Sequence, residues 1–140
     1  MEKKLQYHFL NLFNFALADT QIDVKEAEKL YDIALEKGIS KSELDYVIDN
    51  PHKIHTVLPT DIDEIIEQTI DIAKIILADG KVDIREIQAF KKFLALTLEN
   101  SMLIEDIVES VIDSVKDGLE NTTIKEKLLL IIQGEQDGWY

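Results

Sequence analysis

A ten-residue phrase occurs twice in this chain, sixty positions apart, and this repetition constrains the fold more than any other feature. The sequence LADTQIDVKE at residues 17–26 aligns with LADGKVDIRE at residues 77–86. Five of the ten positions are identical, and three more exchange similar residues. Similarity at a fixed offset indicates two copies of one supersecondary unit. We therefore predict a duplicated structural unit in which the phrase connects one element to the next.

Helical periodicity runs through nearly the whole chain. There are only two prolines and five glycines in 140 residues, a composition that favours helices. Apolar residues recur at steps of three and four, as on the buried face of a helix. The predicted fold is all-α: one domain over residues 1–140, forming a compact bundle of about seven helices. Two three-helix repeats, about residues 5–50 and 60–118, flank a linker at 51–59, and a closing helix covers about 123–134.

Several helix ends have recognisable capping residues. Gly38, Gly118 and Gly134 each follow an apolar periodic segment, and glycine there is typical of a helix C-terminus. Ser40 and Glu43 have the spacing of a capping box, which predicts the start of a short third helix. His8 stands alone on the predicted first helix, with no neighbouring residue that suggests a site.

The net charge of −13 is unevenly distributed. Residues 1–60 carry 7 basic and 10 acidic groups, a net −3, whereas residues 61–140 carry 8 and 18, a net −10. Such a field repels nucleic acid and anionic lipid, so neither is expected as a partner. It suits cations or a basic protein partner, and it is equally compatible with a well-solvated acidic surface.

Other function classes lack the residues that they need. The chain has no cysteine, which excludes disulfides and zinc–thiolate sites. It has no glycine-rich phosphate loop and no hydrolase motif, so we assign no catalytic residue and expect a protein that is not an enzyme. The longest strongly apolar run, residues 128–132, is too short to span a bilayer. We expect a cytoplasmic protein without direct membrane insertion.

The repeated acidic phrase partly matches a calcium-binding EF-hand loop. Residues 79–86 match positions 5 to 12 of that loop, with Asp79 and Asp83 as oxygen ligands, Gly80 at the turn and Glu86 at the last position. Positions 1 and 3 would be apolar residues at 75 and 77, which cannot bind a cation. A true EF-hand is therefore rejected, because neither loop alone supplies enough ligands.

Two interpretations of the acidic residues remain open. In each copy the second aspartate and the glutamate have capping-box spacing, a structural role worth about 1 kcal/mol per cap. The first aspartate instead lies at a helix C-terminus, where the helix dipole disfavours an anion by about 0.3–1 kcal/mol. If the repeats pack together, the carboxylates converge and require a hard cation such as Ca²⁺ or Mg²⁺, or basic side chains. The predicted metal ligands are Asp19, Asp23, Glu26, Asp79, Asp83 and Glu86.

The pattern Leu-Ala-Asp-Gly-x-Val-Asp-x-x-Glu at 77–86, on a helix–loop–helix, resembles the TerB-like tellurite-resistance family. The helical domain of this family is related to a domain of some J-domain co-chaperones. The resemblance covers most of the chain and implies a compact all-helical domain built from a duplicated unit. It also implies a role in tellurite or stress resistance, metal binding by the acidic residues, and no enzymatic activity. The first loop departs from the pattern, with Thr20 in the place of Gly80.

The predicted sixth helix has an acidic face opposite its apolar stripe. The carboxylates recur at steps of three and four, where like charges cost about 0.2–0.5 kcal/mol per pair. They form either a solvated face or a docking surface for a basic protein partner. The candidate partner-binding residues are Asp106, Glu109, Asp113 and Asp117, with Glu120 continuing the series.

The leading functional hypothesis is a non-enzymatic TerB-like protein that binds a divalent cation through its duplicated acidic loops, in tellurite or stress resistance. The alternative is a protein–protein interaction module. In that case the acidic loops are helix caps, and the acidic face binds a basic partner.

Overall fold

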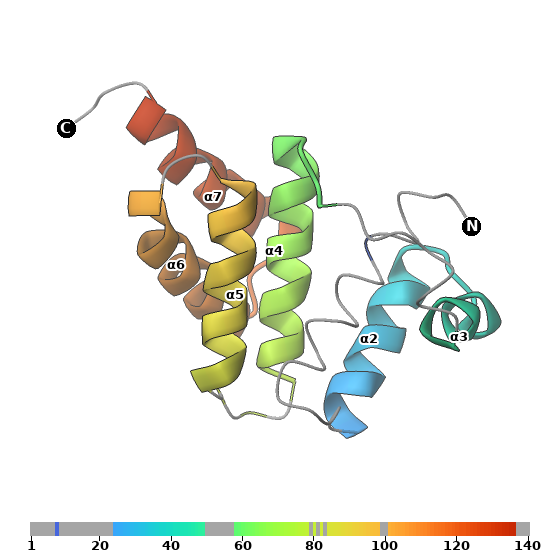
Figure 1. Cartoon of the computed structure of the whole chain (residues 1–140). Coiled ribbons are helices and arrows are strands. Elements are labelled where there is room, and N and C mark those ends of the chain that lie inside the picture. Colours follow the sequence, from blue (N-terminus) through green and yellow to red (C-terminus); the bar gives the residue numbers. More distant parts are fainter. Residues whose placement is uncertain are drawn as a thin grey trace.

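The computed structural model describes residue 8 and residues 24–49, 58–78, 80, 82, 84–98 and 101–136. Within these residues the chain forms six α-helices and one 3₁₀ turn, with no strand, so the predicted all-α class is confirmed (Figure 1). The predicted helix over residues 5–18 lies outside the described residues except for His8, whose backbone is helical. The elements are α2 (Val24–Glu36), α3 (Lys41–Asp49), α4 (Ile62–Ile76), α5 (Ile84–Thr97), η2 (Ser101–Leu103), α6 (Ile104–Lys116) and α7 (Asn121–Gln136).

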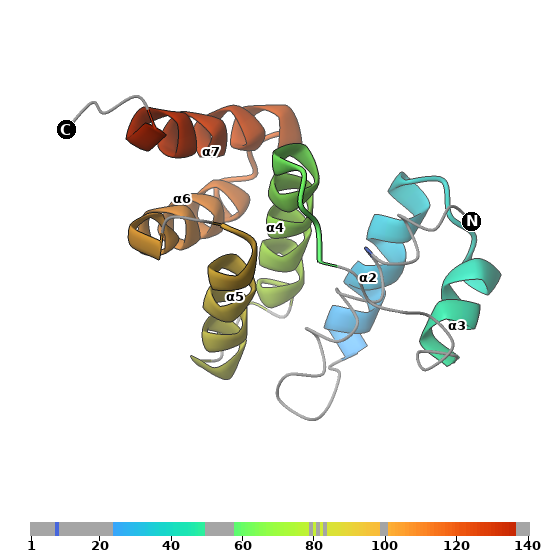
Figure 2. The ribbon, with the colours of Figure 1, turned by 45° about the horizontal axis from the view of Figure 1, so that its top comes forward.

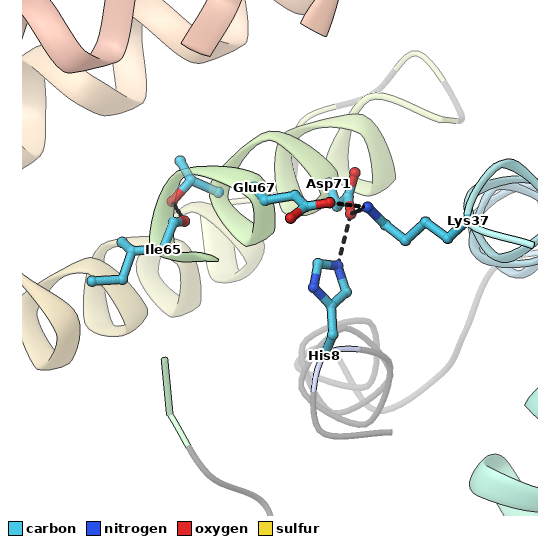
Figure 3. A network of polar contacts seen from close by, with 6 residues as sticks. His8, Lys37, Ile65, Glu67 and Asp71 are labelled. Atoms are coloured by element: carbon cyan, nitrogen blue, oxygen red, sulfur yellow. Dashed lines mark hydrogen bonds and ion pairs between the residues drawn. The ribbon is translucent and has the colours of Figure 1, made fainter. Parts of the chain in front are cut away.

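Helix α4 forms the centre of the described structure and packs against α2, α5, α6 and α7. Ten of its fifteen residues are buried, because isoleucine and alanine occupy nearly every side of the helix. Three of these buried residues, Gln68, Thr69 and Asp71, are polar. The hydroxyl of Thr69 donates to the carbonyl oxygen of Ile65 at 2.6 Å, which satisfies it within its own helix (Figure 3).

The remaining helices lie on two sides of α4. Helices α5, α6 and α7 gather on one side, and α2 with α3 lies on the other, in both views of the molecule (Figures 1 and 2). Helix α3 packs on α2 and buries Leu44 completely. The core is continuous across α4, since Leu30 and Ile33 of α2 belong to the same apolar cluster as Phe90 and Leu94 of α5.

The positions of the helices follow the sixty-residue offset. Helix α2 begins at Val24 and α5 at Ile84, while α3 begins at Lys41 and η2 at Ser101. Among the described residues, α3 packs on α2 as α6 packs on α5, and α6 also packs on α4 and α7. Superposition of the two repeats stays a prediction, since the first helix of repeat one lies outside the described residues.

Two of the three predicted glycine caps are confirmed by their geometry. Gly38 has φ +78°, its N–H donates to the carbonyl of Leu35 at 3.0 Å, and the N–H of Ile39 donates to the carbonyl of Ala34 at 2.9 Å. This pair of bonds is a Schellman motif. The motif requires a left-handed backbone conformation, which only glycine adopts without strain. The same arrangement occurs at Gly118, with φ +72°, at the end of α6.

The capping box is also confirmed, and one predicted helix end is not. The N–H of Glu43 donates to Oγ of Ser40 at 3.2 Å, and the N–H of Ser40 donates to Oε1 of Glu43 at 3.4 Å. Helix α7, in contrast, passes through Gly134 and continues to Gln136. Its buried stripe of Ile124, Leu128 and Ile132 holds the helix in the core up to that point, and this packing outweighs the weak helix propensity of one glycine.

Candidate functional site

Most of the predicted cation ligands lie outside the described residues. This is true of Asp19, Asp23, Asp79 and Asp83, and of the side chain of Glu26, whose backbone is in the first turn of α2. Glu86 is described, and its carboxylate is buried, with 4% of the residue exposed in the first turn of α5. Among the residues that the structure describes, no three acidic or histidine side chains are grouped to hold a metal ion. The cation site therefore stays a prediction.

Gly80 has a conformational role in the second loop. Its φ is +76°, and its N–H donates to the carbonyl of Leu77 at 3.1 Å, just beyond the end of α4. A β-branched residue, such as the threonine that the first copy has at this place, would be strained at this φ. The turn therefore requires a glycine at this position whether or not a cation is bound.

The acidic face predicted on α6 is exposed in the structure. The opposite face is buried through Ile107, Val111 and Ser114, and it packs against α4, α5 and α7. Met102, in the turn that leads into α6, is 79% exposed. The following carboxylate residues all face solvent: Asp106, Glu109, Asp113, Asp117 and Glu120.

These five carboxylates have no intramolecular partner among the described residues. Ion pairs there join Lys37 to α4, Lys91 to Glu105 and Lys125 to Asp63, and none reaches the five. Glu105 is the α6 carboxylate that is neutralised, at 2.7 Å from Nζ of Lys91. The neighbouring carboxylates repel one another, and those in the last turn also face the negative end of the helix dipole. The face is therefore acidic overall, with Lys116, three positions after Asp113, as the basic residue beside it on α6.

A buried polar cluster joins three segments of the chain, and the sequence did not predict it (Figure 3). Oδ2 of Asp71 lies 2.7 Å from Nε2 of His8 and 3.5 Å from Nζ of Lys37. Nζ of Lys37 also donates to Oε1 of Glu67 at 2.5 Å. Asp71 and His8 are 3% and 6% exposed, so their hydrogen bond is shielded from solvent.

The charge of Lys37 is maintained by this cluster. Desolvation by itself would lower its pKa, but the negative charge of Asp71 and the hydrogen bond to Glu67 outweigh burial and raise the pKa of Lys37 above 10.5. A charged lysine next to a buried aspartate compensates the desolvation of that carboxylate. The arrangement links residue 8 and α2 to α4, which is a structural role.

One sequence feature could have indicated this cluster. Asp71 lies between Ile70 and Ile72 in an apolar segment, and all three are buried. A carboxylate in such a segment requires a partner, because burying an unpaired charge costs several kcal/mol. The pattern of α4 identifies the need, but it does not name His8, which is 63 positions away.

No family model, curated protein or solved structure matches this chain. The resemblance to the TerB-like family stays a prediction from the residues of the acidic phrase. No helix in the described part of the chain is both long and apolar enough to cross a bilayer.

Proposed function

We propose that this protein is a non-enzymatic interaction module that docks a basic segment of a partner protein on the outward face of α6. One observation carries the proposal: five carboxylates are exposed along one face, and no basic side chain of the described residues lies within ion-pair distance of Asp106, Glu109, Asp113, Asp117 or Glu120.

A basic partner relieves a cost that the isolated fold bears. Adjacent carboxylates at helical spacing repel by about 0.2–0.5 kcal/mol per pair. Lysine or arginine side chains placed along the face convert that repulsion into attraction and accelerate encounter through long-range steering. The exposed Met102 at the start of the same helical segment offers an apolar contact beside the charges.

The test neutralises two of these carboxylates and compares the result with an equal change elsewhere. The variant carries Glu109→Gln and Asp113→Asn, and the control carries Glu28→Gln and Asp32→Asn on the exposed side of α2. Both lose two negative charges, so they have the same net charge. A lysine-rich peptide is titrated into each isotope-labelled protein, and amide chemical shifts are followed at two salt concentrations.

We expect shifts along residues 102–120, a salt-sensitive affinity, and weaker binding only for the α6 variant. Proteins captured from a cell extract by the wild type and by the control, but not by the α6 variant, would be candidate partners. Equal weakening in both variants would mean that the peptide responds to net charge, and the docking face would be rejected.

A second candidate function is cation binding by the duplicated acidic loops, in the tellurite or stress resistance that the TerB-like resemblance implies. Two features support this proposal: the carboxylates recur in both copies of the loop, and Gly80 forms a tight turn in the second copy. A bound Ca²⁺ or Mg²⁺ ion would stabilise the fold by about 2.7 kcal/mol at a hundredfold excess over Kd, and Asp79→Asn would abolish most of that gain. Equal thermal midpoints with Ca²⁺, with Mg²⁺ and with chelator would eliminate the cation site.

A further inference from the structure

A pocket of about 220 Å³ lies where α2, α4 and the connection from α6 to α7 approach one another. Its lining comes from all three regions, so it exists only in the folded chain. Ile33 of α2 and Ile124 of α7 are each 1% exposed and form part of the core beside it. Val115 and Leu119, at the end of α6, complete the apolar part of the lining.

The Schellman motif at the end of α6 shapes one wall of the pocket. Gly118 has φ +72°, and the N–H of Leu119 donates to the carbonyl of Ser114 at 3.1 Å. These bonds hold the turn in one conformation and keep Leu119 packed against the core. The apolar lining is therefore preformed, which lowers the entropic cost of binding a ligand there.

Two lysines line the same pocket, one on α2 and one on α4. Lys29 and Lys74 are both partly buried, and neither has a carboxylate within ion-pair distance among the described residues. The other partly buried lysines of the described chain all have such a partner, since Lys125 lies 3.5 Å from an aspartate oxygen and Lys37 and Lys91 each lie 2.7 Å or less from a glutamate oxygen. The charged side chains that line the pocket are thus mostly basic, although the protein as a whole is acidic.

We propose that this pocket binds a small monocarboxylate with a short apolar tail, its carboxylate facing Lys29 and Lys74 and its tail lying on the partly exposed Val115 and Leu119. Charge complementarity selects the head group, since a carboxylate forms strong hydrogen bonds with ammonium groups away from bulk water. The apolar lining selects the tail through burial of its hydrocarbon surface.

The volume and the remaining charge restrict the ligand further. A space of 220 Å³ corresponds to about seven water molecules at ~30 Å³ each, so the ligand has roughly that many non-hydrogen atoms, as hexanoate does. Glu36 also lines the pocket and opposes an anion. Its neutralisation should therefore tighten binding of a monocarboxylate, whereas it would weaken binding of a ligand that carries an ammonium group.

The probe is hexanoate, with 1-hexanol as an uncharged ligand of similar size. Each is titrated into the labelled full-length protein, and amide chemical shifts are recorded for the wild type and four variants. Lys29→Gln and Lys74→Gln remove the proposed partners, Glu36→Gln removes the opposing charge, and Lys92→Gln is the control because Lys92 is exposed on α5 and does not line the pocket. Thermal midpoints show that each variant is folded, as expected since glutamine keeps most of the lysine stem.

We expect saturable hexanoate shifts at residues around Ile33, Gly118 and Ile124. Lys74→Gln and Lys29→Gln should each weaken the affinity by about tenfold, the typical value of one hydrogen bond to a charged group. Lys92→Gln should leave it unchanged, and Glu36→Gln should strengthen it. The absence of saturable shifts, equal binding of 1-hexanol, or weaker binding after Glu36→Gln would each overturn the proposal. None of these outcomes depends on partner binding at the outward face of α6.

Discussion

Nε2 of His8 lies 2.7 Å from Oδ2 of Asp71, although the two residues are 63 positions apart in the chain (Figure 3). The contact ties residue 8 to the central helix α4 at a place where both side chains are buried. Lys37 approaches the same oxygen from α2. Asp71 on α4 thus connects two other segments of the chain. The residues next to Asp71 in the sequence do not indicate which segments these are.

Asp71→Ala is expected to destabilise the protein by about 3 kcal/mol, because it leaves the buried partners of the carboxylate without their acceptor. Urea unfolding measures the change. Glu67→Gln is the control: its side chain also contacts Lys37, but it is 57% exposed, so the expected loss is about 0–1 kcal/mol. Equal losses of stability in the two variants would show that the buried contact of Asp71 contributes no more to the free energy of unfolding than the exposed contact of Glu67.

The hydrogen bond between Tyr31 and Asp45 predicts a change in stability at alkaline pH. The Tyr31 hydroxyl donates to Oδ1 of Asp45, and this bond, with burial and the charges of Asp45 and Asp49, raises the pKa of Tyr31 from 10.0 to about 12. Since the folded pKa is the higher one, the stabilisation is fully present below pH 10 and is lost as the pH rises through about 12. Tyr31→Phe should remove this part of the alkaline destabilisation.

Two measurements check this prediction. Chemical unfolding at a series of pH values should show a smaller loss of stability for Tyr31→Phe than for the wild type across that alkaline range. The difference between the tyrosinate absorbance titrations of the two proteins should give one tyrosine that ionises near pH 12. Identical alkaline profiles would mean that the hydroxyl ionises freely and that α2 and α3 are not joined through it.

Ser40→Ala should destabilise the protein by about 1 kcal/mol, because α3 loses the side chain that accepts from the N–H of Glu43. Glu43→Gln keeps a side chain that can complete the capping box, so a smaller loss is expected. Equilibrium unfolding of both variants makes the comparison. A loss of similar size in both would place the contribution in the charge of Glu43 and not in the cap.

The same cap gives a prediction at acid pH. The backbone N–H and the hydroxyl of Ser40 donate to the Glu43 carboxylate and lower the pKa of Glu43 below 4.5. Because the folded pKa is depressed, the contribution is present above pH 4.5 and is lost as the pH falls through the folded value. Glu43→Gln should remove this component of the acid dependence.

Glu109→Gln should stabilise the isolated protein, in contrast to most substitutions. Glu109 has carboxylates four and three positions before it, at Glu105 and Asp106, and four positions after it, at Asp113. Removing each repulsive pair is expected to yield about 0.2–0.5 kcal/mol, and less for the pair with Glu105, whose charge Lys91 neutralises. Glu105→Gln makes the same chemical change on the same helix but breaks the contact with Lys91, so its expected effect is neutral to slightly destabilising. A gain in stability for both would indicate a response to net charge alone.

Local sequence was sufficient to predict several of the helix ends. The glycine cap at Gly38 and the capping box of Ser40 and Glu43 depend on residues within six positions of one another, and both predictions are confirmed. Gly134 shows the limit of such local rules, because the apolar stripe of α7 continues the helix beyond it. The exposure of the α6 acidic face followed from periodicity, since one side of that helix had to enter the core.

The helical class, the cap at Gly38 and the exposed acidic face of α6 could be predicted from the sequence, because each depends on spacing along a single element. The central position of α4, the contact of His8 with Asp71, and the pocket that Lys29 and Lys74 line with Ile124 are visible only in the folded structure. Those relationships join residues from different helices. Their geometry depends on how all the buried side chains pack together, and no pattern along one helix contains that information.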